Sequence, residues 1–101
     1  MKIFDLLKME AQDYEKRSVN VFFQNGLFKT RVIVLEPGGE IPACQMDSYV
    51  MFYVVAGEVL IRKNDESSIL KENQVLISEP ALLSIKSAMG ARLMGVQINV
   101  R

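Results

Sequence analysis

The stretch PGGEIPACQMDSYVMFYVVAGEV, residues 37–59, decides the fold. A turn signal at 37–39 opens it, and a β-branched and aromatic run ends at a second turn signal, 56–58. Turn residues at both ends of such a run are typical of a β-strand. We expect one long strand over 42–55, a turn at 56–58 and a return strand over 59–63.

The same alternation of apolar runs and turn residues continues along the chain from residue 18. Short strands with closely spaced turns are typical of an all-β sandwich or barrel. The further strands are expected over 19–24, 28–35, 68–71, 74–78, 81–87 and 94–100.

Three features add detail to this pattern. Asn25-Gly26 predicts a hairpin whose two turn residues both have φ > 0. Asn64-Asp65 predicts another turn. The last strand has apolar residues at 94, 96, 98 and 100 and smaller or polar ones between them, which predicts an apolar inner face and a polar outer face.

The composition sets limits on function. The 101 residues are enough for one domain with one core, and a formal net charge of zero does not favour nucleic-acid binding. No apolar run is long enough to span a membrane, and residues 1–17 lack the features of a secretory signal. A single Cys excludes an internal disulfide and suits the cytoplasm, where we expect the protein. The absence of His excludes His-based triads and His-ligated zinc or iron.

Residues 1–17 differ from the rest of the chain. Ile3, Leu6 and Leu7 fit one face of a helix, whereas residues 10–17 are mostly polar. A short helix and an extended arm both fit this pattern. We therefore expect an N-terminal segment, 1–17, that packs on a barrel formed by 18–101.

Five positions in the opening stretch carry a resemblance to a known family. Their spacing matches a motif with Gly, two His, Glu and a closing Gly, which here falls on Gly38, Cys44, Met46, Val50 and Gly57. This motif resembles the first conserved motif of the cupins, in particular the small single-domain cupins. The resemblance implies a double-stranded β-helix, or jelly-roll barrel, with the metal ligands replaced.

A second cupin motif is fainter. Residues 72–74 stand at its turn, 75–77 at its strand and Pro80 near its Pro, so that its His falls on Leu83 or Ser84. The apolar parity of 81–87 belongs inside the barrel, which favours Leu83. Asn73 stands where the family has Gly, and Asn tolerates positive φ.

The resemblance also implies which side chains face the interior. The family's ligand side is the inside of the barrel, and alternate residues of a strand share a face. Inward residues then include Val54, while Gln45 and Asp47 point outward. The expected ligand-binding residues of the barrel interior are Cys44, Met46, Val50, Phe52, Leu83 and Ile85.

This apolar and sulfur-containing set does not suit a divalent metal, which cupins hold with imidazole and carboxylate groups. We therefore expect no metal and no other cofactor. Cys44 is expected to be a small buried hydrophobic residue. Two alternatives stay open for it, a soft-metal site for Cu(I) with Met46 and a reactive thiol.

The outer face of the long strand is apolar as well. It carries Tyr49, Met51, Tyr53 and Val55. A face of this kind is normally covered. We expect a homodimer through it, with the N-terminal segment as the alternative cover.

Three functions are compatible with these sequence features. The first is a non-catalytic barrel that binds a small apolar ligand or has a structural role. The second is a metal-independent isomerase or epimerase, in which Tyr49, Tyr53, Lys86 or Glu79 replaces the missing His. The third is the Cu(I) binder. Arg31 and Arg92 are expected to be either solvated edge residues or contacts for an anion at a barrel mouth. The acidic residues in or beside turns are expected to be exposed to water; these are Glu40, Asp47, Glu58 and Glu79.

Overall fold

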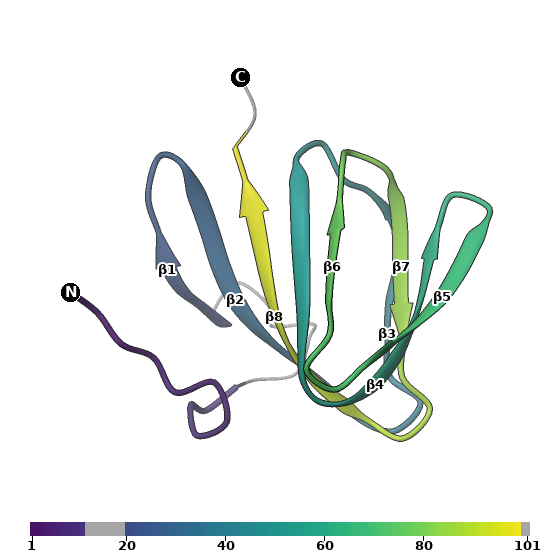
Figure 1. Ribbon diagram of the computed structural model, residues 1–101, viewed down its shortest axis with the longest axis horizontal. Coiled ribbons are helices and arrows are strands. Elements are labelled where there is room, and N and C mark those ends of the chain that lie inside the picture. The colour runs from purple at the N-terminus through teal and green to yellow at the C-terminus, as the bar shows by residue number, and fades with distance from the viewer. Residues whose placement is uncertain (12–19, 100–101) are drawn as a thin grey trace.

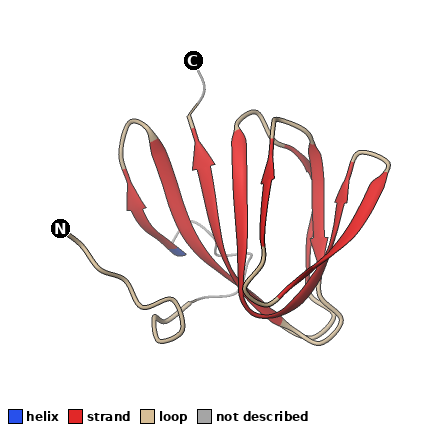
Figure 2. Ribbon diagram, in the orientation of Figure 1, coloured by secondary structure: helices blue, strands red, loops and turns tan. Residues whose placement is uncertain are grey.

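The computed structural model describes residues 1–11 and 20–99, and nearly all regular structure there is β-strand (Figures 1 and 2). The strands are β1 (Val21–Gln24), β2 (Phe28–Leu35), β3 (Glu40–Gln45), β4 (Tyr49–Lys63), β5 (Glu66–Lys71), β6 (Val75–Ser78), β7 (Leu82–Lys86) and β8 (Ala91–Ile98).

The strands form two antiparallel sheets that share β4. In the first sheet β1, β2, β8, the first part of β4 and β6 lie side by side. In the second sheet β3, β7, the last part of β4 and β5 do so. Figure 1 shows the strands coming together near the bend of β4 and fanning apart from there. This arrangement confirms the predicted all-β jelly roll.

The predicted turn at 56–58 is wrong, because β4 continues through it as one strand. Gly57 has φ +84°, and the pairing of β4 with β8 shifts between Val54 and Ala56. This irregularity bends the strand, so that residues 49–57 pair in the first sheet and 58–63 in the second. A Cβ added at Gly57 would lie 2.5 Å from the carbonyl oxygen of Gly90, so the bend depends on glycine.

The predicted single strand over 42–55 is also interrupted. β3 ends at Gln45 and β4 begins at Tyr49, with residues 46–48 between them. β3 belongs to the second sheet through its pairing with β7, whereas the start of β4 belongs to the first. The opening motif therefore lies across both sheets.

Two turn predictions are confirmed and one is corrected in detail. Asn64 and Asn73 both have positive φ, at 53° and 65°. The hairpin after β1 is present, but neither Asn25 nor Gly26 has positive φ. Instead the Asn25 side-chain oxygen accepts hydrogen bonds from the N–H groups of Leu27 (2.8 Å) and Phe28 (3.0 Å), which closes the turn by a different conformation.

The expected direction of the last strand is wrong. Leu93 is fully buried, and Gly95 and Gln97 line the space between the sheets. By alternation the side chains of 94, 96 and 98 lie on the outer side, where Ile98 is 40% exposed. Hydrophobic alternation does not reveal the inner face here, because the outer face is apolar too. Val100 lies outside the described residues.

The core fills the space near the bend of β4. Its largest fully buried side chains come from both sheets and include Val54, Val59, Ile85 and Leu93. Val32 is equally buried but lies apart from this cluster, on the outer side of β2. The first sheet is therefore covered on both sides near β2.

Residues 1–11 form an arm rather than a helix. The arm contains one turn, in which the Asp5 carbonyl oxygen accepts a hydrogen bond from the Met9 N–H (3.0 Å). The Arg92 guanidinium ties this turn to β8 by donating to the carbonyl oxygens of Leu6 and Met9, both at 3.0 Å. The predicted division at residue 17 falls outside the described residues and stays a prediction.

No helix in the described part of the chain has the length and apolar character needed to cross a membrane.

Candidate functional site

A cavity of about 360 Å³ lies between the two sheets and is partly open to solvent. The first sheet contributes side chains from β2, β4 and β8, and the second contributes side chains from β3 and β7. The described residues that line it are Lys29, Arg31, Ile33, Ile41, Cys44, Met46, Phe52, Leu83, Ile85, Gly95, Val96 and Gln97.

Five of the six predicted interior residues come together around this cavity. Phe52 faces it from β4, Leu83 and Ile85 face it from β7, and Cys44 and Met46 lie at and just beyond the end of β3. Val50 is fully buried in the core but does not line the cavity.

Ile41 is a lining residue that strand parity misses. In the register of β3 and β7, Ile41 is opposite Ile85 and Cys44 is opposite Leu83. Three residue steps on β3 thus match two on β7, which is a β-bulge. The bulge brings Ile41 and Cys44 to the same side although strict alternation would separate them.

The expectation that Cys44 is buried is wrong. Cys44 is exposed, and its thiol lies 3.8 Å from the Gln45 carbonyl oxygen. Met46 is half-buried, and its N–H donates to the Ala81 carbonyl oxygen at 2.9 Å, which fixes the chain after β3 beside β7. The two sulfur-containing residues therefore form an accessible wall of the cavity.

The positions where the cupin motif has metal ligands do not fit a hard divalent cation. Cys44, Met46, Val50 and Leu83 offer one thiol, one thioether and two aliphatic side chains, none of which is an imidazole or carboxylate. Among residues 1–11 and 20–99, no three His, Cys, Asp or Glu side chains lie close enough together to hold a metal ion.

One side of the cavity is polar, which the predicted apolar set does not include. Lys29 and Arg31 face the cavity from β2, and Gln97 faces it from β8. The Arg31 guanidinium donates a hydrogen bond to the Gln97 side-chain oxygen at 3.1 Å. The signal in the sequence was the alternation of Lys29, Arg31 and Ile33 on one face of β2.

The candidate catalytic residues lie elsewhere, since none of Tyr49, Tyr53, Glu79 and Lys86 lines the cavity. The Tyr53 hydroxyl donates a hydrogen bond to the Asn73 side-chain oxygen at 2.6 Å. Glu40, Asp47 and Glu58 are exposed, as expected. Arg92 binds the N-terminal arm rather than facing the cavity.

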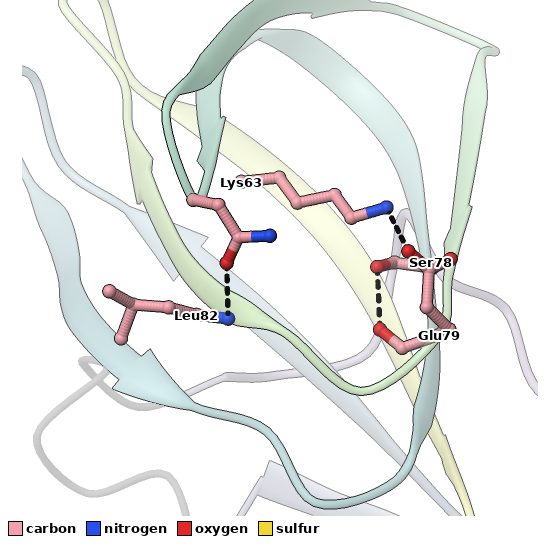
Figure 3. A network of polar contacts seen from close by, with 5 residues as sticks. Lys63, Ser78, Glu79 and Leu82 are labelled. Atoms are coloured by element: carbon pink, nitrogen blue, oxygen red, sulfur yellow. Dashed lines mark hydrogen bonds and ion pairs between the residues drawn. The ribbon is translucent and has the colours of Figure 1, made fainter.

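Glu79 belongs to a small polar network that joins the ends of β4 and β6, and beside it the Asn64 side-chain oxygen accepts a hydrogen bond from the Leu82 N–H of β7 at 3.3 Å (Figure 3). Its carboxylate forms an ion pair with the Lys63 ammonium group, and the buried Ser78 hydroxyl donates to the Glu79 carbonyl oxygen at 2.7 Å. The hydrogen bond from Lys63, a hydrogen bond from its own N–H and the Lys63 charge lower the pKa of Glu79. The network connects strands and lies outside the cavity.

Comparisons of sequence find no match: no protein-family model matches the chain, and neither does any curated protein. Solved structures do match. A protein from Thermus thermophilus is 24% identical, with a TM-score of 0.84 and 97% of each chain covered. An RmlC-like cupin protein from Desulfovibrio desulfuricans is 16% identical, with a TM-score of 0.82, over 97% of this chain and 96% of that one.

An uncharacterized conserved protein with a double-stranded β-helix domain from Klebsiella pneumoniae gives a TM-score of 0.82 at 18% identity. The match covers 97% of this chain and 90% of that one. At these identities the likeness shows the fold. The chain has the cupin fold, as its opening motif predicts.

Proposed function

We propose that this cupin-fold barrel is a non-catalytic binding domain that holds a small, mainly apolar molecule in the cavity between its sheets, without a divalent metal. The cavity itself is the observation that carries the proposal. Its volume of about 360 Å³ is at the lower end of the range for small-molecule sites, about 300–1,000 Å³. Phe52, Leu83 and Ile85 supply an apolar wall of the kind that such sites use.

Binding is favoured over catalysis by where the reactive groups lie. The side chains considered as substitutes for a catalytic His are outside the cavity, so none of them reaches a molecule held there. Cu(I) binding remains the second candidate, because the two sulfur-containing residues Cys44 and Met46 both line the cavity.

Titration with benzyl alcohol, followed by amide NMR, tests the binding proposal. We expect shifts confined to residues around the cavity. Cys44→Trp should abolish them by filling the open side, and its exposed position makes misfolding a minor concern. Gln45→Trp is the matched control, because Gln45 is exposed and does not line the cavity. Shifts spread over the surface, or retained in Cys44→Trp, would contradict the proposal.

Elemental analysis of tag-free protein tests the absence of a divalent metal. We expect less than a tenth of an equivalent, as an order of magnitude, of iron, manganese, nickel or zinc, because the ligand positions lack imidazole and carboxylate groups. One equivalent of any of these metals would end this part of the proposal. A cytoplasmic location is proposed alongside it, because an exposed free thiol is stable in a reducing compartment.

We further propose that two copies pair through an outer apolar face of the first sheet. This face consists of Tyr49, Met51, Tyr53 and Val55 of β4, with Val75 and Ile77 of β6 and Met94 and Ile98 of β8 beside them. Several of these side chains are strongly exposed, Ile77 at 63% and Tyr49 at 46%. A patch of this kind is normally covered in solution.

A second copy suits this face better than the N-terminal arm does. The arm is held at Arg92, near the start of β8, and packs Phe4 against Phe22 of β1. In the first sheet, β1 and β6 are at opposite edges. The face carries no charged residue and the chain has no net charge, so two copies do not repel each other. A symmetric pair would bury the same patch on both copies.

Sedimentation tests the pairing. We expect a dimer at micromolar concentration that Ile77→Lys converts to a monomer. Ile69→Lys is the control, since Ile69 has a similar exposure of 55% but lies on β5 in the second sheet. A stable monomer of 11.4 kDa for the unmodified protein would refute the pairing.

A further inference from the structure

The cavity that we propose as a binding site has an uneven distribution of charge. Two of its described lining residues are cationic, Lys29 and Arg31, and none is Asp or Glu. Both cations come from β2, and the apolar residues Leu83 and Ile85 come from β7 in the opposite sheet. Among the described residues, the cavity thus has a side with two cations, called here the positive side, and an apolar side.

The position of the cations follows from strand geometry. Lys29, Arg31 and Ile33 are alternate residues of β2 and share its inner face. β8 lies beside β2 (Figure 1), with Gln97 opposite Lys29 and Gly95 opposite Arg31. Gly95 has no side chain, and a Cβ added there would lie 3.2 Å from the Ile33 side chain and 3.3 Å from the Phe52 ring, so these two residues occupy the space above it.

Gln97 orients the guanidinium group of Arg31. Its side-chain oxygen accepts the hydrogen bond from Arg31 at 3.1 Å, which holds the guanidinium at the cavity wall. A carboxylate at position 97 would oppose this positive charge, whereas an amide carries no charge of its own. Apolar walls of low polarisability strengthen the field of both cations inside the cavity.

We propose that the ligand of this cavity is a small organic anion, with an anionic group held by Lys29 and Arg31 and an apolar body against Phe52, Leu83 and Ile85. This inference rests on the proposed binding function and names its ligand class. Arg and Lys bind carboxylates and phosphates through charge-assisted hydrogen bonds, which are stronger than neutral ones. The anionic group gives the orientation, and the apolar body fills the volume of about 360 Å³.

The test compares three probes of similar body: benzoate, phenyl phosphate and uncharged benzyl alcohol. We expect at least one anion to bind about tenfold or more tightly than the alcohol, as charge-assisted hydrogen bonds suggest. The tighter anion identifies the head group as carboxylate or phosphate. Added salt should weaken the anion and leave the alcohol unchanged.

Two substitutions locate the effect. Gln97→Glu, which is nearly isosteric, and Lys29→Gln should each reduce the affinity for the preferred anion to that for benzyl alcohol. Lys86→Gln is the control, because Lys86 is exposed on β7 and does not line the cavity. Unchanged melting temperature and unchanged alcohol binding show that each variant keeps its fold and its cavity.

The possible outcomes separate the two proposals. If benzyl alcohol binds as tightly as both anions, the inference about charge is overturned while small-molecule binding stands. If no probe shifts the cavity residues, the binding function itself fails. An anion preference that survives Gln97→Glu and Lys29→Gln would show that the anion binds elsewhere and would also overturn the inference.

Discussion

Replacement of Gly57 by Ala probes the bend on which the two-sheet barrel depends. Gly57 has φ +84°, a conformation that costs a residue with a side chain about 1–2 kcal/mol. The new Cβ would also lie 2.5 Å from the Gly90 carbonyl oxygen and 3.0 Å from the Ala91 Cα. Both neighbours are backbone atoms, so relief requires a backbone shift of the kind that costs about 1–3 kcal/mol.

The sum predicts a loss of about 2–5 kcal/mol in the free energy of unfolding for Gly57→Ala. Two other glycines separate the contributions. Gly38 has φ +80° but open space around its Cβ position, so Gly38→Ala should cost only the conformational part, about 1–2 kcal/mol. Gly26 has open space and no positive φ, so Gly26→Ala should be neutral or stabilising by up to about 1 kcal/mol.

Urea denaturation followed by circular dichroism measures all three variants against the unmodified protein, because a single small domain usually unfolds in one step. Thermal melts should show the same order, with about 4–8 °C for each kcal/mol in a domain of this size. If Gly57→Ala loses no more stability than Gly38→Ala, the close approach of β4 to the turn before β8 is not real.

Three further predictions concern single side chains. In a carboxyl NMR titration, Lys63→Met should raise the pKa of Glu79, and identical titrations of the two proteins would disprove the ion pair. Because the pKa of Glu79 is lowered in the folded protein, the stabilisation from this ion pair is present above the ordinary Glu pKa and is lost as the pH falls through the lowered pKa. Cys44 should react with a thiol reagent without denaturant, and benzyl alcohol should slow the reaction; a thiol that reacts only on unfolding is not at the cavity. Leu83→Ala should cost about 2–3 kcal/mol in urea denaturation, since Leu83 is 4% exposed, and an unaltered midpoint would contradict that burial.

The fold was predictable from the sequence because the opening motif places its turn residues at fixed distances. Gly38 and Gly57 both have the positive φ that the motif positions require, and so does Asn73 in the second motif. What the motif did not reveal is that Gly57 bends one strand rather than joining two. A positive φ fits both geometries, and only the pairing partners of residues 58–63 distinguish them.

The apolar part of the candidate site was predictable in the same way, and its polar part was not. Strand parity selected Phe52, Leu83 and Ile85 correctly as lining residues because these are the buried faces of β4 and β7. It failed for Gln97, because the outer side of β8 is the more apolar one. It failed for Ile41 because a bulge in β3 interrupts the alternation.

The shared strand β4 has a consequence for how the molecule opens. Every hydrogen-bonded path between β8 and β7 runs through β4, so neither sheet can detach while that strand keeps its partners. Backbone amides in both halves of β4 should therefore exchange with deuterated water at the rate of global unfolding, whereas the outlying β1 exchanges sooner. The strands that line the cavity therefore belong to one cooperative unit and should unfold together.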